Sequence, residues 1–238
     1  MKLLTAPAGN PKVKKGIKQN FANFILHLAP ANLSGYEVCP KRSIGCTMAC
    51  LNTAGRGGMF KKGENTNNIQ KARIRKTIWL FENRQTFLEQ LVKDIESAIK
   101  SSKKKGLTSV FRLNGTSDLS WEKYSVIRNG TEYQNIFFAF SEVQFYDYTA
   151  IVGRKVKDIP NYHLTFSRKE SNHTDVLKAI AHGMNVAVVF FKSLPETFLG
   201  LPVINADEDD LRFLDPKRVI CGLTAKGKAK KDKSGFVA

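Results

Sequence analysis

The sequence is poor in three features that would narrow its class at once. Acidic residues are scarce, since 21 Asp and Glu stand against 38 Lys and Arg, which gives a formal net charge of +17. Cysteine occurs only four times in 238 residues, too rarely for a disulfide framework. No run approaches the roughly 18 consecutive apolar residues that a membrane helix needs. These absences argue against a disulfide-stapled exported domain and against a helical membrane protein.

What is present is typical of a folded globular protein. The sequence is 42% hydrophobic and 10% aromatic, enough for a packed core. The first apolar stretch breaks at Pro7 and is too short for the core of a signal peptide, so we expect a soluble cytoplasmic protein, in the host cytoplasm if a virus encodes it. The positive charge favours phosphate-bearing partners, such as nucleic acids, nucleotides or phosphorylated cofactors, although a solvated lysine-rich surface would give the same balance.

The domain organisation is predicted to be simple, because the chain shows no internal repeat and no clear boundary. We expect one α/β domain over residues 1–225, followed by a basic tail over 226–238. Such a charge run is usually a solvated, mobile end, and the alternative is an arm that contacts phosphates.

Apolar runs alternate with helical patterns along most of the chain. A helical pattern over 68–105 breaks at Asn83, and shorter helices are expected over 135–140 and 175–182. Strands alternating with helices predict a mainly parallel sheet, as an open sheet or a partial barrel, with functional groups at the carboxyl ends of the strands. The predicted strands are 21–29, 109–114, 143–148, 162–167, 185–191 and 219–223, with a weaker one at 202–206.

Three of the four cysteines, Cys39, Cys46 and Cys50, follow the first predicted strand in the stretch C-P-K-R-S-I-G-C-T-M-A-C. Clustered thiolates bind zinc or iron–sulfur clusters. Structural zinc commonly uses two close cysteine pairs, whereas this stretch has one close pair, so a fourth ligand would be Cys221 or a histidine. Three cysteines on one loop suit a cubane cluster with one open iron. An iron–sulfur cluster, a zinc ion and unmetallated thiols all remain alternatives from the residues alone.

Polar residues follow two further strands. N-G-T-S-D, residues 114–118, comes after the second strand, and T-F-S-R, residues 165–168, ends the fourth. In a parallel sheet these groups and the cysteines converge on one edge. The first of the two could also be an ordinary turn, because Asn, Gly, Ser and Asp all favour turns.

This order of strand, three-cysteine loop, helix and second strand with a Gly-containing polar turn resembles the radical S-adenosylmethionine (SAM) superfamily over roughly residues 20–225. The spacing here, C-x6-C-x3-C, is a variant of that family's C-x3-C-x2-C. The resemblance implies a partial (β/α)6 TIM-like barrel of mainly parallel strands. It also implies a 4Fe–4S cluster on Cys39, Cys46 and Cys50, whose open iron binds SAM for reductive cleavage to a 5′-deoxyadenosyl radical.

The same resemblance implies which residues hold SAM. The turn after the second strand takes the place of the family motif that binds the amino group of SAM, and the end of the fourth strand takes the place of groups that bind its ribose or carboxylate. The guanidinium of Arg168 could bind a carboxylate in a bidentate manner. The cofactor-binding residues implied are Asn114, Gly115, Thr116, Ser117, Asp118, Thr165, Ser167 and Arg168.

The chain also resembles a group of bacteriophage proteins with a similar cysteine loop and an R-L-N-G-T-S-D segment, a resemblance that implies no activity. The sequence therefore predicts an iron–sulfur enzyme of radical SAM type, with a nucleic acid or nucleotide as the first substrate class to test. No residue identifies the reaction. The alternative is a non-catalytic nucleic-acid-binding or viral effector protein with a structural zinc or iron–sulfur site.

Overall fold

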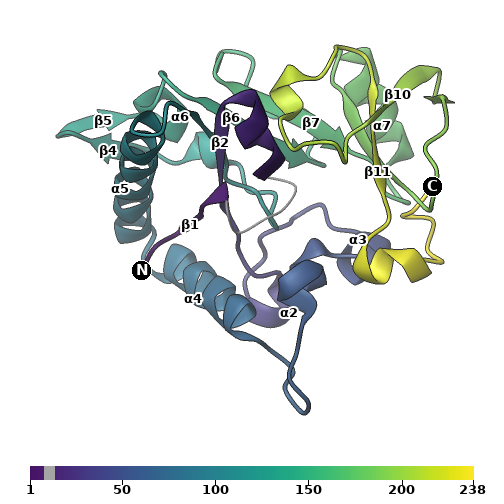
Figure 1. Cartoon of the computed structure of the whole chain (residues 1–238), viewed down its shortest axis with the longest axis horizontal. Coiled ribbons are helices and arrows are strands. Elements are labelled where there is room, and N and C mark those ends of the chain that lie inside the picture. Colours follow the sequence, from purple (N-terminus) through teal and green to yellow (C-terminus); the bar gives the residue numbers. More distant parts are fainter. Residues whose placement is uncertain (8–13) are drawn as a thin grey trace.

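The centre of the molecule is one nine-stranded sheet, seen in a computed structural model that describes residues 1–7 and 14–238 (Figure 1). Seven neighbouring strands pair in parallel, while the two end strands, β1 and β9, are antiparallel to their neighbours. In spatial order the strands are β1 (Leu4–Thr5), β2 (Phe21–Leu26), β3 (Thr108–Arg112), β6 (Gln144–Thr149), β7 (Tyr162–Ser167), β8 (Val186–Phe190), β11 (Ile220–Thr224), β10 (Leu201–Asn205) and β9 (Thr197–Phe198).

The order of the parallel strands confirms the main prediction from the sequence. The six strongly predicted strands are β2, β3, β6, β7, β8 and β11. In the sheet they lie side by side in this same order. The weaker seventh, β10, extends the sheet beyond β11. Among the described residues β1 and β9 do not pair with each other, so the sheet is not closed. The structure therefore shows a mixed α/β fold with a large, mostly parallel sheet, and it does not show a TIM barrel.

The predicted helical stretch over 68–105 is two helices, α4 (Asn68–Glu82) and α5 (Arg84–Lys103). Asn83 separates them and caps α5, because its side chain accepts a hydrogen bond from the backbone N–H of Thr86. Gly106 lies beyond the end of α5 with a φ of 66°, a conformation that glycine adopts without strain.

The main hydrophobic core lies between α5 and the first strands of the sheet. Phe87, Leu91 and Ile95 from the helix are fully buried, as are Phe111 and Phe145 from β3 and β6. Burying one such side chain stabilises the fold by about 1.5–3 kcal/mol. A second cluster joins α7 (His173–Ala181) to β7 and β8. These two cores hold the strands in place and so fix where their carboxyl ends lie.

A hairpin between β3 and β6 was not predicted. β4 (Val126–Arg128) and β5 (Thr131–Tyr133) form a two-stranded antiparallel sheet joined by Asn129 and Gly130. Both joining residues have positive φ, 52° and 78°, as a tight hairpin turn requires. The predicted helix over 135–140 is the single turn α6 (Ile136–Ala139).

The basic C-terminal residues are folded onto the domain, which corrects the expectation of a solvated, mobile end. They begin with the 3-10 helix η7 (Gly227–Lys231), and Ala229 and Val237 are buried. The backbone N–H of Ala238 donates a 2.8 Å hydrogen bond to the carbonyl of Val189. Figure 1 shows these yellow residues beside α3 (Ile44–Met48), the short helix that carries Cys46.

The helices within residues 1–7 and 14–238 include none long and apolar enough to cross a bilayer.

Candidate functional site

Residues 39–60, here called the cysteine segment, follow β2 and the short helix α2 (Ala31–Ser34). Cys39 lies in the loop before α3, Cys46 lies within α3, and Cys50 caps the 3-10 helix η3 (Leu51–Thr53). All three are half-buried free thiols. The segment therefore places three cysteines beyond the carboxyl end of the first parallel strand, as the sequence predicts.

The three thiols share one electrostatic environment. Burial raises the pKa of each, that of Cys39 to about 12, and a charge on Cys50 would raise the pKa of Cys39 and Cys46 further. Two cations oppose this effect. Lys169 lowers the pKa of Cys39 and Cys46, and Arg73 lowers that of Cys50. Thiolates here would therefore need positive charge close by, which a bound metal group supplies.

The arrangement of possible metal ligands around the thiols can be described directly. Within the described residues, no three His, Cys, Asp or Glu side chains are arranged to hold one metal ion. The backbone N–H of Asn52 lies 3.5 Å from Sγ of Cys50, and hydrogen bonds of this kind to sulfur tune iron–sulfur sites.

The turn after β3 packs directly against the cysteine segment. Sγ of Cys39 lies 3.9 Å from the carbonyl oxygen of Thr116, and the N–H of Asp118 donates a 2.7 Å hydrogen bond to the carbonyl of Val38. Gly115 permits the turn to approach the end of β2 closely, since a Cβ there would lie 2.5 Å from Ile25 Cγ2 and 2.7 Å from the Leu26 carbonyl oxygen. The structure thus brings the turn over 114–118 and the cysteines together.

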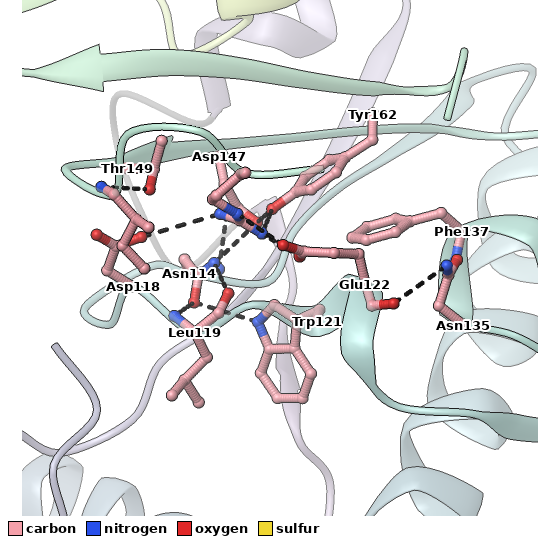
Figure 2. Close-up of polar contacts among 12 residues, drawn as sticks. Asn114, Asp118, Leu119, Trp121, Glu122, Asn135, Phe137, Asp147, Thr149 and Tyr162 are labelled. Carbon is pink, nitrogen blue, oxygen red and sulfur yellow. Dashed lines mark hydrogen bonds and ion pairs between the residues drawn. The ribbon is translucent and has the colours of Figure 1, made fainter. Parts of the chain in front are cut away.

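The side chain of Asn114, however, points inward and is fully occupied. Its Nδ2 donates to the Leu119 carbonyl (3.0 Å) and to Oδ2 of Asp147 (3.2 Å). Its Oδ1 accepts from the hydroxyl of Ser117 (2.8 Å), the N–H of Leu119 (2.9 Å) and the indole of Trp121 (3.1 Å). Figure 2 shows Asn114 at the centre of these contacts. Asn114 and Ser117 therefore shape the turn from within.

Asp118 also faces the protein interior. One carboxylate oxygen accepts from the N–H of Ala150 (2.8 Å), and the other lies 3.9 Å from Nη1 of Arg154 in a buried ion pair. Burial raises the pKa of Asp118, while the Ala150 hydrogen bond and Arg154 act in the opposite direction. Arg154 also pairs with Glu122 and extends this buried network toward Tyr162.

The residues predicted at the end of β7 are placed in three different ways. Thr165 is fully buried, and its hydroxyl has no hydrogen-bond partner within the described part of the chain. Ser167 is half-buried, and its carbonyl accepts from the side chain of Asn172. The guanidinium of Arg168 donates to the carbonyls of Gly235 and Phe236, at 2.6 and 2.8 Å. Arg168 thus holds the C-terminal residues.

The next two residues, Lys169 and Glu170, hold the cysteine segment and were missed by the sequence analysis. Nζ of Lys169 donates to the Lys41 carbonyl (2.5 Å). The carboxylate of Glu170 accepts from the hydroxyl of Ser43 (2.8 Å) and the N–H of Gly45 (2.7 Å). Their position directly after a predicted strand was the signal that could have identified them.

The C-terminal residues complete the support of the cysteine segment. Ala49 shares a buried cluster with Ala225, Ala229 and Val237. Gly45 faces Ser234 so closely that a Cβ there would lie 2.1 Å from the Ser234 hydroxyl oxygen. The outer face of the segment is apolar and exposed, through Ile44, Met48, Leu51, Met59 and Phe60.

Comparison with known proteins gives one family. No curated protein and no solved structure matches the chain. A family model described as gene product 88 matches residues 2–238, nearly the whole chain. This agrees with the predicted resemblance to a group of phage proteins, while the likeness to the radical SAM superfamily stays a prediction. The chain belongs to the gene product 88 family, a phage-type family.

Proposed function

We propose that this protein is an iron–sulfur enzyme of radical SAM type, with a 4Fe–4S cluster on Cys39, Cys46 and Cys50. The observation that carries the proposal is the packing of a three-thiol segment, which follows the first parallel strand, against the turn that follows the second. When bound, the cluster would bind SAM at its open iron and supply the electron for its reductive cleavage. The protein's own task is to hold and shield that chemistry.

Several side chains and one backbone N–H near the cysteines suit an anionic cluster bound by thiolates. Lys169 and Arg73 place positive charge near the thiols, and the N–H of Asn52 points at Cys50. Glu170 fixes the first turn of α3 through Ser43 and Gly45. These groups would orient the ligands and stabilise their charged form.

The geometry narrows the residues proposed to contact SAM. Asn114, Ser117 and Asp118 use their side chains inside the protein, so their proposed role is to shape the turn. Gly115 and Thr116 would then contact the cofactor through the backbone next to Cys39. Thr165 and Ser167 would offer hydroxyl groups from β7, whereas Arg168 would act through the C-terminal residues it binds.

The test is anaerobic purification or reconstitution of the full chain, followed by measurement of iron and sulfide, absorption and electron paramagnetic resonance. We expect about four irons per chain and release of 5′-deoxyadenosine when SAM and a reductant are added. The variants Cys39→Ala, Cys46→Ala and Cys50→Ala should each lose the cluster. Cys221→Ala is the matched control, because Cys221 is buried on β11 with Sγ 3.3 Å from a carboxylate oxygen of Asp215.

Two results would overturn the proposal in different ways. If the protein holds an iron–sulfur cluster but leaves SAM intact, the proposed cluster is confirmed and the proposed radical SAM activity is wrong. If the protein is colourless and holds one zinc per chain that stays bound after Cys39→Ala, both the proposed cluster and the proposed activity are wrong. That second result would favour a non-catalytic nucleic-acid-binding or viral effector protein with a structural zinc.

A further inference from the structure

A cleft of about 480 Å³ lies where β8 and β11 end, at the same edge of the sheet as the cysteine segment. Its walls come from the residues that follow the two strands and from η7. The lining residues are Phe191, Lys192, Thr224, Ala225, Lys226 and Lys230. The cleft therefore combines one aromatic ring with three lysines.

Phe191 is 47% exposed, and Phe60 of the cysteine segment is the one other exposed phenylalanine among the described residues. The preceding residue, Phe190, is buried and packs edge-on against Phe198, so β8 ends with one phenyl ring inside the core and one outside it. An exposed ring in a cleft offers a flat apolar face on which a planar ligand can stack.

The lysines around Phe191 differ in whether a carboxylate of the protein already pairs with them. Nζ of Lys226 lies 2.5 Å from a carboxylate oxygen of Asp207. Lys192 and Lys230 are exposed and form no ion pair with the described residues. Lys228 and Lys231 extend the positive charge along η7. The cleft thus presents exposed ammonium groups suited to phosphates beside the ring.

The cleft is structurally joined to the cysteine segment. Gly227, at the start of η7, faces Ala54 of the segment, and Ala229 shares a buried cluster with Ala49. A ligand in the cleft would therefore lie along the wall that also supports the thiols.

We propose that this cleft binds an unpaired nucleobase together with its phosphate, as supplied by single-stranded nucleic acid. The base stacks on Phe191, and the phosphates contact Lys192 and Lys230. Stacking on an aromatic side chain and phosphate contacts with lysine are the two elements by which proteins hold single strands without reading their sequence. Paired bases in a duplex are not available to the ring. The further claim that the bound strand is the substrate rests on the proposed function, whereas the binding itself does not.

The test is a fluorescence anisotropy titration of the full chain with a labelled oligothymidylate, beside the same strand in a duplex. Phe191→Ala should weaken single-strand binding about tenfold, because it removes the ring on which the base stacks. Phe191→Tyr should retain it. Lys192→Ala and Lys230→Ala should each weaken binding and make the slope of log K against log salt shallower by about 0.7. Matched controls are Leu177→Ala and Lys178→Ala on the exposed side of α7, which should change nothing.

The outcomes separate this proposal from the previous one. Equal affinity for duplex and single strand, or unchanged affinity in Phe191→Ala, overturns the cleft as the binding site. Competition by thymidine monophosphate as effective as that by the oligomer would assign the site to a free nucleotide, which keeps the same base and phosphate chemistry. The titration is repeated with Cys46→Ala, because strand binding without a cluster supports the cleft even if SAM cleavage is never observed.

Discussion

The turn over 114–118 and the cysteine segment lie against each other at one edge of the sheet, yet they are built in opposite ways. In the turn, Asn114 makes five hydrogen bonds through its side chain and is 2% exposed. In the cysteine segment the thiols have only weak contacts, and Ile44, at 78% exposed, faces outward. The polar turn at the end of β3 therefore has a structural role, whereas the side chains that are available to bind a ligand lie in the cysteine segment beside it.

Among the tests of this contrast, Asn114→Ala has the largest expected effect on stability. The substitution removes the acceptor of the Trp121 indole and of the Ser117 hydroxyl in a buried site. It also removes one of three hydrogen bonds to the Asp147 carboxylate, which keeps those from the Asn114 backbone N–H and the Tyr162 hydroxyl. We expect a loss of roughly 3–5 kcal/mol in the free energy of unfolding, because each unsatisfied buried group costs about 1–3 kcal/mol. Urea denaturation measures it. The control from the cysteine segment is Met48→Ala, 66% exposed, which should stay within about 0.5 kcal/mol. Equal effects in the two variants would break the contrast.

A second test uses pH. Burial raises the pKa of Asp147 to about 7, although the N–H of Asn114, Arg112 and the hydroxyl of Tyr162 act to lower it. The folded protein therefore holds this proton more tightly than the unfolded chain. The stability contributed is complete below about pH 4 and is lost as the pH rises through 7.

Urea midpoints of the wild type and Asp147→Asn between pH 5 and 8 measure this effect. The stability of the wild type relative to the variant should fall by about 2.6 kcal/mol over that range, most of it between pH 5 and 7. A difference that stays constant with pH would show that Asp147 is ionised throughout, and the network would then be an ordinary buried ion cluster.

The smallest expected effect concerns how the cysteine segment is held. Glu170→Ala removes two hydrogen bonds, to Ser43 and Gly45, at a half-buried site. We expect a loss of about 1 kcal/mol in stability and a clear loss of iron retained after reconstitution, with Glu170→Gln in between. Glu64→Ala, an exposed residue without an ion pair among the described residues, is the control. Full iron retention in Glu170→Ala would mean that the segment orders itself without β7.

Much of the fold follows from local sequence. Apolar runs such as V-A-V-V-F predicted the parallel strands, and the pattern of Leu88, Leu91 and Ile95 predicted α5. The hairpin was missed although its signal, Asn129 followed by Gly130, is local and strong. The partial barrel implied by the resemblance depends on how the sheet curves along its whole width, which no local pattern specifies.

The candidate site was predictable in its position and less so in the direction of its side chains. The rule that groups gather at the carboxyl ends of parallel strands placed the turn near the cysteines correctly. Whether Asn114 points in or out depends on Asp147, 33 residues away, and on Trp121. Likewise, Arg168 looked free for a ligand because its partners, Gly235 and Phe236, lie 67 and 68 residues further along the chain.

The packing of the C-terminal residues on the cysteine segment also has a consequence in time. During synthesis β3, β6, β7, β8 and β11 can each pair in parallel with a strand already made, since the spatial order of these strands follows the chain. The cysteines emerge early, but Ala225, Ala229 and Val237, which pack on Ala49, emerge only after the intervening sheet. The cysteine segment is therefore uncovered on that side until these residues have been made, so its final packing belongs to a late step of folding.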